Sequence, residues 1–303
     1  MKTLVTGAAG FIGSHVVAAL REQGEEPVAL VRPGADTRDL AGVEVVEADY
    51  ADEAAARVAL RSVAPSAVVH TAWRVAPGSE YLHDPANIDH LRASLRLFPV
   101  AAEEGCRRIV GIGTCLEYGD SGTATAEDAP LRPTTLYGAS KAALFTAADA
   151  WAGTIGLSFA WARLYYPFGP REAPHRLVPA VTNALLRGER IATTAGDQRR
   201  SFLYVEDVAR AIAAIATSDT RGPVNVGAPE AIPIRELLER LARLLRRPDL
   251  LDVGALPARP GDPAVLCPDV AKLETVVGWR PRTGLDEGLE RTVEWWRSRA
   301  GAQ

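Results

Sequence analysis

The sequence predicts an α/β protein in which a doubly wound parallel sheet is followed by a smaller C-terminal α/β lobe. Two observations carry this prediction. Short apolar runs alternate with helical patterns along the first half of the chain, with short connections between them, as in strands that pair in parallel through helical crossovers. A glycine-rich turn also joins the first apolar run to the first helical pattern, as at the ligand site of such sheets. The 303 residues are 47% hydrophobic, enough for one or two domains with a large core.

Composition excludes several classes of function. The formal net charge is -4 and no run of Lys and Arg occurs, so we expect no nucleic-acid partner. Cys106, Cys115 and Cys267 show neither disulfide nor metal-ligand spacing, as in a reducing compartment, and we expect no metal. No apolar run approaches the roughly 20 residues that span a bilayer, and no signal peptide precedes the first strand. We therefore expect a soluble cytoplasmic protein with no membrane partner.

The first strand and helix meet in the sequence KTLVTGAAGFIGSH, residues 2–15. The apolar residues before the first glycine leave no room for a helix, and those after the second recur at helical spacing. Gly7 suits the bend, Gly10 the close approach of the backbone to a pyrophosphate, and Gly13 the packing of helix on strand. The alternative is a turn with a purely structural role. Because free N–H groups at a helix start favour a phosphate, we expect a dinucleotide site that includes Gly7, Gly10, Phe11, Ile12 and Gly13.

The end of the second strand, Pro27–Val31, indicates which dinucleotide binds. A carboxylate just past this strand binds the ribose 2′-hydroxyl of NAD, whereas an arginine accommodates the 2′-phosphate of NADP. Arg32 stands there, nineteen residues after Gly13, and no acidic residue follows until Asp36. The sequence therefore favours NADP over NAD, which stays possible if Arg32 only faces solvent.

The next two strands add further candidate cofactor contacts. After the strand Val43–Val46, Asp49 and the backbone of Tyr50 are placed to bind the adenine amino group, and the alternative for Asp49 is a helix cap, a role that Asp52 also fits. The strand Ala67–Thr71 contains His70, which we expect to be a hydrogen-bonded core residue. Thr71, Ala72 and Trp73 follow at its end, where the cofactor of a doubly wound sheet lies.

A hydroxyl, a phenol and an ammonium group follow the fifth strand, Arg108–Ile112, which comes after a helix from about residue 87 to 105. Thr114 lies just past this strand, and Tyr137 and Lys141 are four residues apart near the start of a helix, on one face of it. The ammonium of Lys141 is expected to lower the pKa of Tyr137 toward neutrality. Tyr137 then exchanges a proton with a sugar oxygen that Thr114 also binds. The predicted chemistry is alcohol oxidation or carbonyl reduction.

In this combination the chain resembles the extended short-chain dehydrogenase/reductase family, the NAD(P)-dependent nucleotide-sugar epimerases, dehydratases and reductases. The resemblance covers nearly the whole chain and implies a Rossmann sheet. It assigns Thr114, Tyr137 and Lys141 to the catalytic triad, the three glycines to the cofactor loop and Asp49 to the adenine. It also implies a dinucleotide-binding domain of residues 1–164 and 199–226 and a substrate-binding lobe of residues 165–198 and 227–303.

The resemblance extends to the substrate site. Residues 163–170, RLYYPFGP, match the family's strand and turn just beyond the nicotinamide. The resemblance assigns Tyr166 to the cofactor site and Tyr166–Phe168 to the floor of the sugar site, and it assigns Cys115, which follows the catalytic hydroxyl, to the substrate site. Arg200 and Arg259 match arginines that grip the diphosphate of a nucleoside-diphosphate sugar, and guanidinium groups suit such a clamp. The alternative is that each arginine pairs with a surface carboxylate, such as Asp262.

Three further expectations concern other parts of the chain. His90 occupies a position where relatives carry an asparagine that helps to position the catalytic lysine. A homodimer, formed through the helix after Asn87 and the helix near Tyr137, follows from the resemblance alone. Trp295 and Trp296 are expected to be core residues of the last helix.

The residues around the triad narrow the reaction. Dehydratases of this family carry Asp and Glu where this chain has Cys115 and Leu116, which argues against 4,6-dehydration. Cys115 and His175 are candidates for an epimerase-reductase acid and base pair, but packing is the better interpretation of Cys115. The leading hypothesis is NADPH-dependent reduction of the 4-keto group of a nucleotide-linked 4-keto-6-deoxyhexose, as in deoxysugar biosynthesis. An NAD-dependent 4-epimerase is the alternative, and a non-catalytic dinucleotide-sensing module is a second one.

Overall fold

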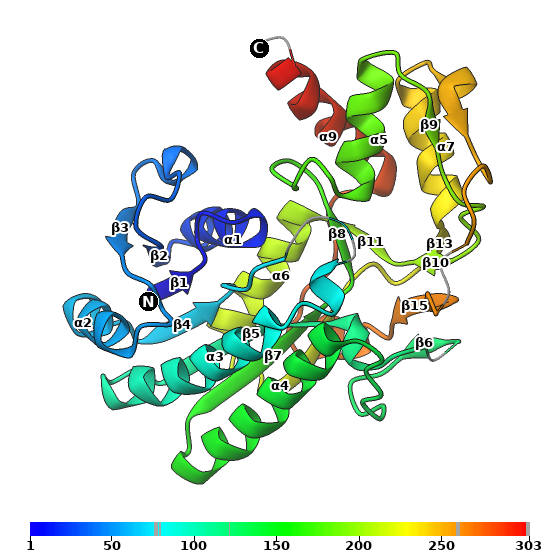
Figure 1. Cartoon of the computed structure of the whole chain (residues 1–303). Helices are drawn as coiled ribbons and strands as arrows, with labels where there is room; N and C mark the ends of the chain where they lie inside the picture. Colours follow the sequence, from blue (N-terminus) through cyan, green and yellow to red (C-terminus); the bar gives the residue numbers. More distant parts are fainter. Residues whose placement is uncertain (76–77, 79, 121, 259–260, 301–303) are drawn as a thin grey trace.

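A seven-stranded parallel sheet forms the centre of the structure (Figure 1). The structure is a computed structural model of residues 1–303 and describes all of them except 76–77, 79, 121, 259–260 and 301–303. The strand order is β12-β7-β5-β4-β1-β2-β3. Strands β2 and β3 are thus added on one side of β1, and the later strands of this sheet, from β4 onward, are added on the other side. The predicted doubly wound arrangement is confirmed. The strands are β1 (Lys2–Thr6), β2 (Glu26–Val31), β3 (Glu44–Glu47), β4 (Ala67–His70), β5 (Arg108–Thr114), β7 (Ser158–Leu164) and β12 (Gly222–Val226).

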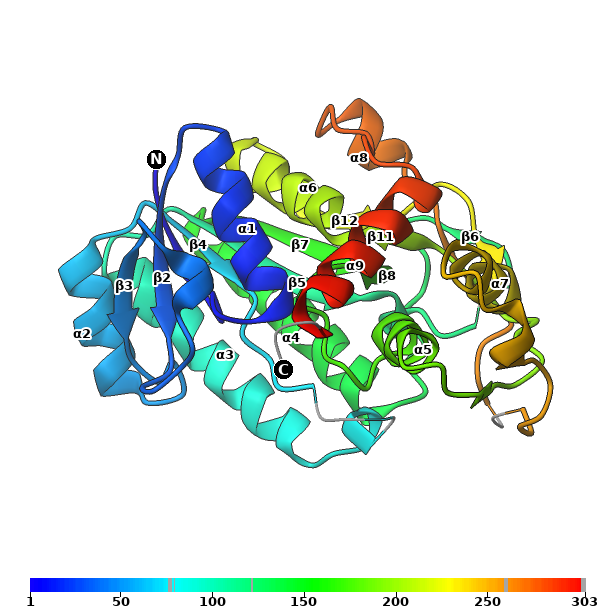
Figure 2. The same ribbon diagram turned by 90° about the horizontal axis from the view of Figure 1, so that it is seen from above.

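Helices cover both faces of this sheet (Figure 2). One face carries α1 (Phe11–Glu22) and α6 (Val205–Thr217), whose apolar residues join those of the strands in one buried cluster. The other face carries α2 (Glu53–Val63), α3 (Ala86–Glu103) and α4 (Leu136–Ile155), which bury a second cluster. Because both faces are covered, the inner strands are buried almost throughout, whereas the edge strand β3 is mostly exposed.

Local signals in the sequence set the starts of two of these helices. The Asp52 carboxylate accepts hydrogen bonds from the backbone N–H groups of Ala54 and Ala55, so Asp52 caps α2 as predicted. Thr135 caps α4 in the same way through the N–H of Gly138. This cap fixes the first turn of α4, which carries Tyr137.

Beyond the carboxyl ends of the strands lie shorter elements with their own apolar cluster. The cluster brings together α5 (Leu177–Leu186), α7 (Ile234–Leu244) and the first part of α9 (Leu285–Ala300). The remaining strands are β6 (Ala124–Thr125), β8 (Tyr166–Phe168), β9 (Ile191–Ala192), β10 (Arg199–Arg200), β11 (Phe202–Tyr204), β13 (Ile232–Pro233), β14 (Leu251–Asp252) and β15 (Val265–Pro268). The short helix α8 is Ala271–Thr275, and the single-turn 3₁₀ helices are η1 (Arg38–Leu40), η2 (Glu80–Leu82), η3 (Cys115–Glu117) and η4 (Pro248–Leu250).

Two expectations about the second half of the chain need correction. Residues 163–170 are not one strand and turn: β7 ends at Leu164 in the central sheet, and β8 pairs with β11 in a separate two-stranded sheet. Trp295 and Trp296 are half-buried rather than in the core. Leu289 and Val293 supply the buried face of α9, and the helix then continues past the apolar cluster. Among the described residues, no helix is long and apolar enough to cross a membrane.

Candidate active site

The glycine turn after β1 has the geometry of a phosphate cradle. Gly7 has a φ of +68°, and a Cβ on Gly13 would lie 2.2 Å from the carbonyl oxygen of Gly7, so only glycine lets α1 pack this closely on the turn. Gly10 precedes α1 without a side-chain cap, and the first turn of α1 contains no acidic residue. The free N–H groups of this turn, at Phe11 and Ile12, therefore suit a diphosphate.

Arg32 stands directly after β2 with an exposed side chain. The acidic residues that follow it already have partners. Asp36 accepts hydrogen bonds from Arg38, which lower its pKa to about 2, and Asp39 forms an ion pair with Arg171 at 2.9 Å. In the described part of the chain, Arg32 itself has no ion pair. Its guanidinium group is therefore available to an anion at the end of β2.

The predicted adenine contacts lie on the next segment. Asp49 is exposed, and its carboxylate accepts a hydrogen bond from the N–H of Ala51. Tyr50 is buried and its hydroxyl forms a 2.7 Å hydrogen bond with Nδ1 of His90, while Nε2 of His90 accepts from the N–H of Arg74 at 3.2 Å. His90 thus fixes Tyr50 and the start of the segment after Trp73, and its ring makes no hydrogen bond to the ammonium of Lys141.

The end of β4 approaches the glycine turn. Thr71 donates from its hydroxyl to the carbonyl of Thr6 at 2.7 Å, and a Cβ on Gly7 would lie 2.8 Å from Ala72. His70 is buried between Thr6 and Ser94, with hydrogen bonds of 2.8 and 2.9 Å, and burial lowers its pKa to about 3. The prediction that His70 is a hydrogen-bonded core residue is confirmed.

Thr114 ends β5 and is held by a buried ion pair. Its hydroxyl accepts from the N–H of Leu116 at 3.3 Å, and its own N–H donates to Glu117 at 2.8 Å. Glu117 also forms a 2.7 Å ion pair with Arg163, and the two side chains are 0% and 1% exposed. Trp161 donates a further hydrogen bond to the same carboxylate. All of these bonds position the residue that the sequence predicts to bind the substrate oxygen.

The structure does not support the predicted effect of Lys141 on Tyr137. The ammonium of Lys141 donates to the carbonyl of Ile112 at 2.7 Å and lies 3.9 Å from the centre of the Trp73 ring, but 6.0 Å from that of Tyr137. Burial raises the pKa of Tyr137, with smaller contributions from the charges of Tyr81 and Glu117. Burial also lowers the pKa of Lys141 to about 7. The phenol is therefore protonated at neutral pH.

Aromatic side chains surround the phenol. The ring of Tyr137 meets the ring of Trp73 at 6.2 Å and that of Tyr81 at 5.2 Å between centres, both edge to face. Trp73 is fixed in turn by a 2.9 Å hydrogen bond from its indole N–H to Asn87. Sequence reasoning missed Tyr81 and Asn87, because neither stands in a recognisable motif.

The predicted substrate residues occupy buried positions. Cys115 is 2% exposed in a cluster with Tyr118, Tyr165 and Leu266, and burial raises its pKa to about 12, so packing accounts for it. Arg200 is 1% exposed and pairs with Asp262 at 2.6 Å, which matches the alternative that it binds a carboxylate. Its guanidinium group also lies 5.3 Å from the centre of the Tyr166 ring. Arg259 lies outside the described residues.

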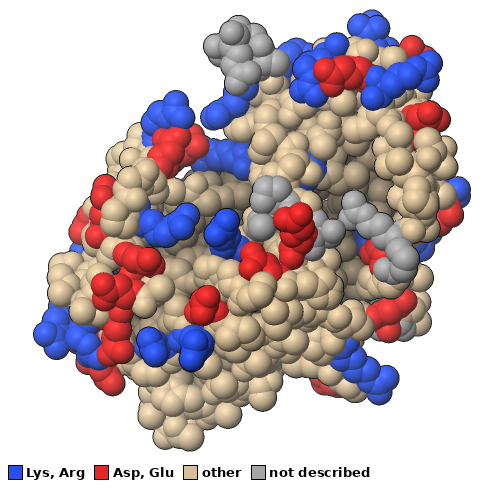
Figure 3. Space-filling model, in the orientation of Figure 1, with Lys and Arg blue, Asp and Glu red and all other residues tan. Residues whose placement is uncertain are grey.

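Positive charge borders the site. Figure 3 shows Lys and Arg side chains, with Asp and Glu side chains among them, around the hollow between the region of α1 to β3 and the region of α5 and α9. This distribution suits a ligand that carries several phosphate charges.

Comparisons with known proteins agree with this geometry. Residues 3–227 match the model of the NAD dependent epimerase/dehydratase family. A probable dTDP-glucose 4,6-dehydratase of Sinorhizobium fredii is 30% identical over 98% of this chain and 93% of its own length. The UDP-glucose 4-epimerase of Thermus thermophilus, solved with NAD, is 31% identical with a TM-score of 0.89, and the alignment covers 98% of this chain and 99% of that one.

A dTDP-glucose 4,6-dehydratase of Streptomyces venezuelae, solved with NAD bound, is 27% identical with a TM-score of 0.90, over 100% of this chain and 98% of that one. The predicted relation to the extended short-chain dehydrogenases/reductases is thus confirmed. The chain belongs to the NAD-dependent epimerase/dehydratase family.

Proposed function

We propose that this enzyme uses NADPH to reduce the 4-keto group of a nucleotide-linked 4-keto-6-deoxyhexose. The observation that carries the proposal is the setting of Tyr137 in the first turn of α4. Its phenol lies edge to face against the rings of Trp73 and Tyr81, and burial raises its pKa above the usual value, which favours the protonated form as a proton donor. Reduction of a carbonyl requires a donor at the oxygen, whereas oxidation of a sugar hydroxyl, the first step of an epimerase or dehydratase, requires a base there.

The roles of the three side chains follow from their positions. Thr114 and Tyr137 bind the carbonyl oxygen at the end of β5, and Tyr137 transfers its phenolic proton to that oxygen. The reduced nicotinamide, when bound, supplies the hydride to C4. Lys141 has a pKa of about 7, so it is able to hold or release a proton at neutral pH and is the group that restores the proton of Tyr137. The ketone thereby becomes a secondary alcohol.

Arg32 supports NADPH as the reductant. Its exposed guanidinium stands directly after β2, where an arginine accommodates a 2′-phosphate. Asp36 and Asp39 are bound to arginines, so neither presents a free carboxylate to repel that phosphate. In Arg32→Ala, NADP should bind less tightly while the affinity for NAD changes little.

The segment after Thr114 offers no carboxylate for dehydration. Cys115 and Leu116 belong to an apolar cluster, and the carboxylate of Glu117 is bound to Arg163, Trp161 and the N–H of Thr114. Elimination of water needs a free acid and base beside the sugar. We therefore do not propose 4,6-dehydration, although two of the relatives compared above are named for it.

A 4-epimerase is the second candidate, favoured by the similarity to the Thermus thermophilus enzyme. The two functions differ in their need for added reductant. Purified protein is incubated with NADPH and a deoxythymidine-diphosphate 4-keto-6-deoxyhexose, and separately with UDP-glucose and no added cofactor. A ketoreductase consumes the absorbance of NADPH only with the ketosugar. Conversion of UDP-glucose to its C4 epimer, without NADPH consumption in the first reaction, would instead establish the epimerase.

We also propose that the enzyme acts as a homodimer through α3 and α4. Ile88 and Leu95 on α3 and Ile155 on α4 are exposed apolar residues, which favours contact with another apolar surface. Leu95→Glu should shift the mass measured by light scattering to that of a monomer. Val58→Glu, at an exposed valine of α2, is the matched control and should leave the mass unchanged.

A further inference from the structure

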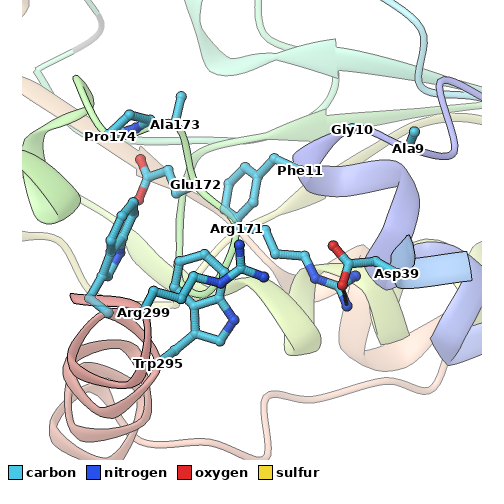
Figure 4. Close-up of a pocket in the computed structure, with 11 residues that line it drawn as sticks. Ala9, Gly10, Phe11, Asp39, Arg171, Glu172, Ala173, Pro174, Trp295 and Arg299 are labelled. Carbon is cyan, nitrogen blue, oxygen red and sulfur yellow. Dashed lines mark ion pairs between the residues drawn. The ribbon is translucent and has the colours of Figure 1, made fainter. Parts of the chain in front are cut away.

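A cavity of about 360 Å³ lies between the glycine turn and the end of the last helix (Figure 4). Gly10 and Phe11 line one side, the segment after β8 with Arg171 and Glu172 lines a second, and α9 contributes Trp295, Trp296 and Arg299. Its volume falls within the range of about 300–1,000 Å³ typical of small-molecule sites. Residues from three distant parts of the chain thus meet at the start of α1.

Two guanidinium groups line this cavity. Arg171 is bound to Asp39 at 2.9 Å. Arg299 lies 4.2 Å from the centre of the Trp295 ring, a cation–π contact, and among the described residues it has no ion pair. Figure 4 shows Arg171, Asp39 and Arg299 reaching toward one another beside Phe11. An aromatic ring therefore holds the charge of Arg299 at the cavity, and, in addition to the stronger effect of Arg38, this charge helps to lower the pKa of Asp36.

The carboxyl group of Glu172 is a second, independent sign of a ligand. Glu172 is 8% exposed, and its Oε2 has no hydrogen-bond partner among the described residues, as is also true of the indole N–H of Trp296. A buried polar group without a partner is costly. Burial raises the pKa of Glu172 to about 8, although its Oε1 lies 3.9 Å from the guanidinium group of Arg176. The raised pKa favours the protonated form, which can donate a hydrogen bond to an anion.

We propose that Arg299, with Trp295 beneath it, binds the diphosphate of the dinucleotide from the side opposite the start of α1. This inference rests on the dinucleotide binding assumed in the proposed function. The free N–H groups of α1 meet the diphosphate from one side, and Arg299 meets it from the last helix. Trp295 and Trp296, expected from the sequence to be core residues, are thereby explained as the support of a binding arginine.

The choice of the diphosphate over the 2′-phosphate follows from position. Arg32 stands at the end of β2, where the 2′-phosphate of NADP lies in a doubly wound protein. Arg299 faces Gly10 and Phe11 across the cavity. The diphosphate is common to NAD, NADP and ADP. Loss of Arg299 should therefore weaken all three ligands, whereas loss of Arg32 weakens NADP alone.

The test is isothermal titration of the full chain with NADP, NAD and ADP, with no sugar present. Arg299→Ala should weaken each ligand about tenfold, the loss expected for a charge-assisted hydrogen bond. Arg297→Ala, at another exposed arginine of α9 that does not line the cavity, is the matched control and should bind as wild type does. The thermal midpoint of each variant without ligand tests for a change in the fold.

Three results would overturn the inference. Unchanged affinities in Arg299→Ala would show that Arg299 does not contact the ligand. A loss of affinity confined to NADP would show that Arg299 binds the 2′-phosphate instead of the diphosphate. An equal loss in Arg297→Ala would show that only the net charge of α9 matters. Trp295→Leu gives a second line of evidence and should weaken the three ligands by about threefold, because the ring that holds the guanidinium is lost. A failure to reduce ketosugars would refute the proposed function without altering any of these affinities.

Discussion

Replacement of either partner in the Glu117–Arg163 pair should destabilise the fold strongly. The two side chains are 0% and 1% exposed and 2.7 Å apart. In Arg163→Met, the carboxylate of Glu117 keeps only the neutral donors of Thr114 and Trp161. In Glu117→Gln, Arg163 keeps as neutral acceptors the hydroxyl of Tyr118 and the carbonyl of Glu127. Each single variant thus leaves one buried charge without its counter-charge.

The magnitude follows from the burial of the pair. Removing one partner of a fully buried ion pair costs about 3–5 kcal/mol, a large share of the roughly 5–15 kcal/mol that stabilises a typical fold. The double variant Glu117→Gln with Arg163→Met leaves no unpaired charge. Its loss should therefore be smaller than the sum of the two single losses by about 2 kcal/mol or more.

Urea unfolding of the four proteins at neutral pH, followed by circular dichroism, measures this cycle. The control is the exposed pair Arg187–Glu189, which is also 2.7 Å apart but 59% and 54% exposed, so Arg187→Met should unfold as wild type does. The reasoning is refuted if the single variants lose less than about 1 kcal/mol, or if the double loss equals the sum of the single ones.

Three further predictions concern the cofactor turn and the catalytic residues. Gly13→Ala should lose dinucleotide affinity and about 1–3 kcal/mol of stability, because its Cβ meets the carbonyl of Gly7. Urea unfolding and titration with the dinucleotide measure the two losses. Gly153→Ala, where a Cβ meets nothing within 4 Å, is the control in both. Tyr137→Phe should lower turnover by about 10²–10⁴-fold with cofactor affinity retained, and equal turnover would refute its role. Lys141→Met should raise the free energy of unfolding most below pH 7. The pKa of the Lys141 ammonium is about 7 in the folded protein, below its value in the unfolded chain, so the wild type gains stability as the pH rises above 7. A difference in unfolding free energy that does not change with pH would contradict this.

The first five strands of the central sheet, β1 to β5, could be predicted because their signals are local, whereas β7 was not predicted as Ser158–Leu164. Each strand is a short apolar run, and the glycines of the first turn are required by contacts among neighbours in sequence, such as Gly13 against Gly7. The cap at Asp52 and the core position of His70 also follow from local patterns. Local patterns define the ends of strands only to within a few residues, so β5, expected to end at Ile112, continues to Thr114.

The electrostatics of the site could not be predicted because they depend on distant residues. Spacing places Tyr137 and Lys141 on one face of a helix, but the carbonyl of Ile112 and the ring of Trp73 hold the ammonium elsewhere. Burial then sets the pKa of both groups. No sequence pattern reveals such tertiary contacts.

The pairing of Glu117 with Arg163 is likewise invisible in the sequence, since the two residues are far apart along the chain. Glu117 lies in η3 after β5 and Arg163 lies within β7, and neither stands in a recognisable motif. The expectation that Trp295 and Trp296 lie in the core was wrong. Two adjacent tryptophans are typical of a core, but α9 continues past the apolar cluster and places them at the cavity.

Transfer of deuterium from reduced cofactor tests the central claim most directly. NADPH labelled at C4 of the nicotinamide, on each face in turn, is incubated with the enzyme and a nucleotide-linked 4-keto-6-deoxyhexose, and the product is analysed by mass spectrometry and NMR. With the label on one of the two faces, one deuterium should appear at C4 of the sugar for each NADP formed, and Tyr137→Phe should transfer it about 10²–10⁴-fold more slowly. A product without deuterium from either labelled cofactor, or a sugar epimerised at C4 while the added NADPH stays reduced, would contradict the reductase.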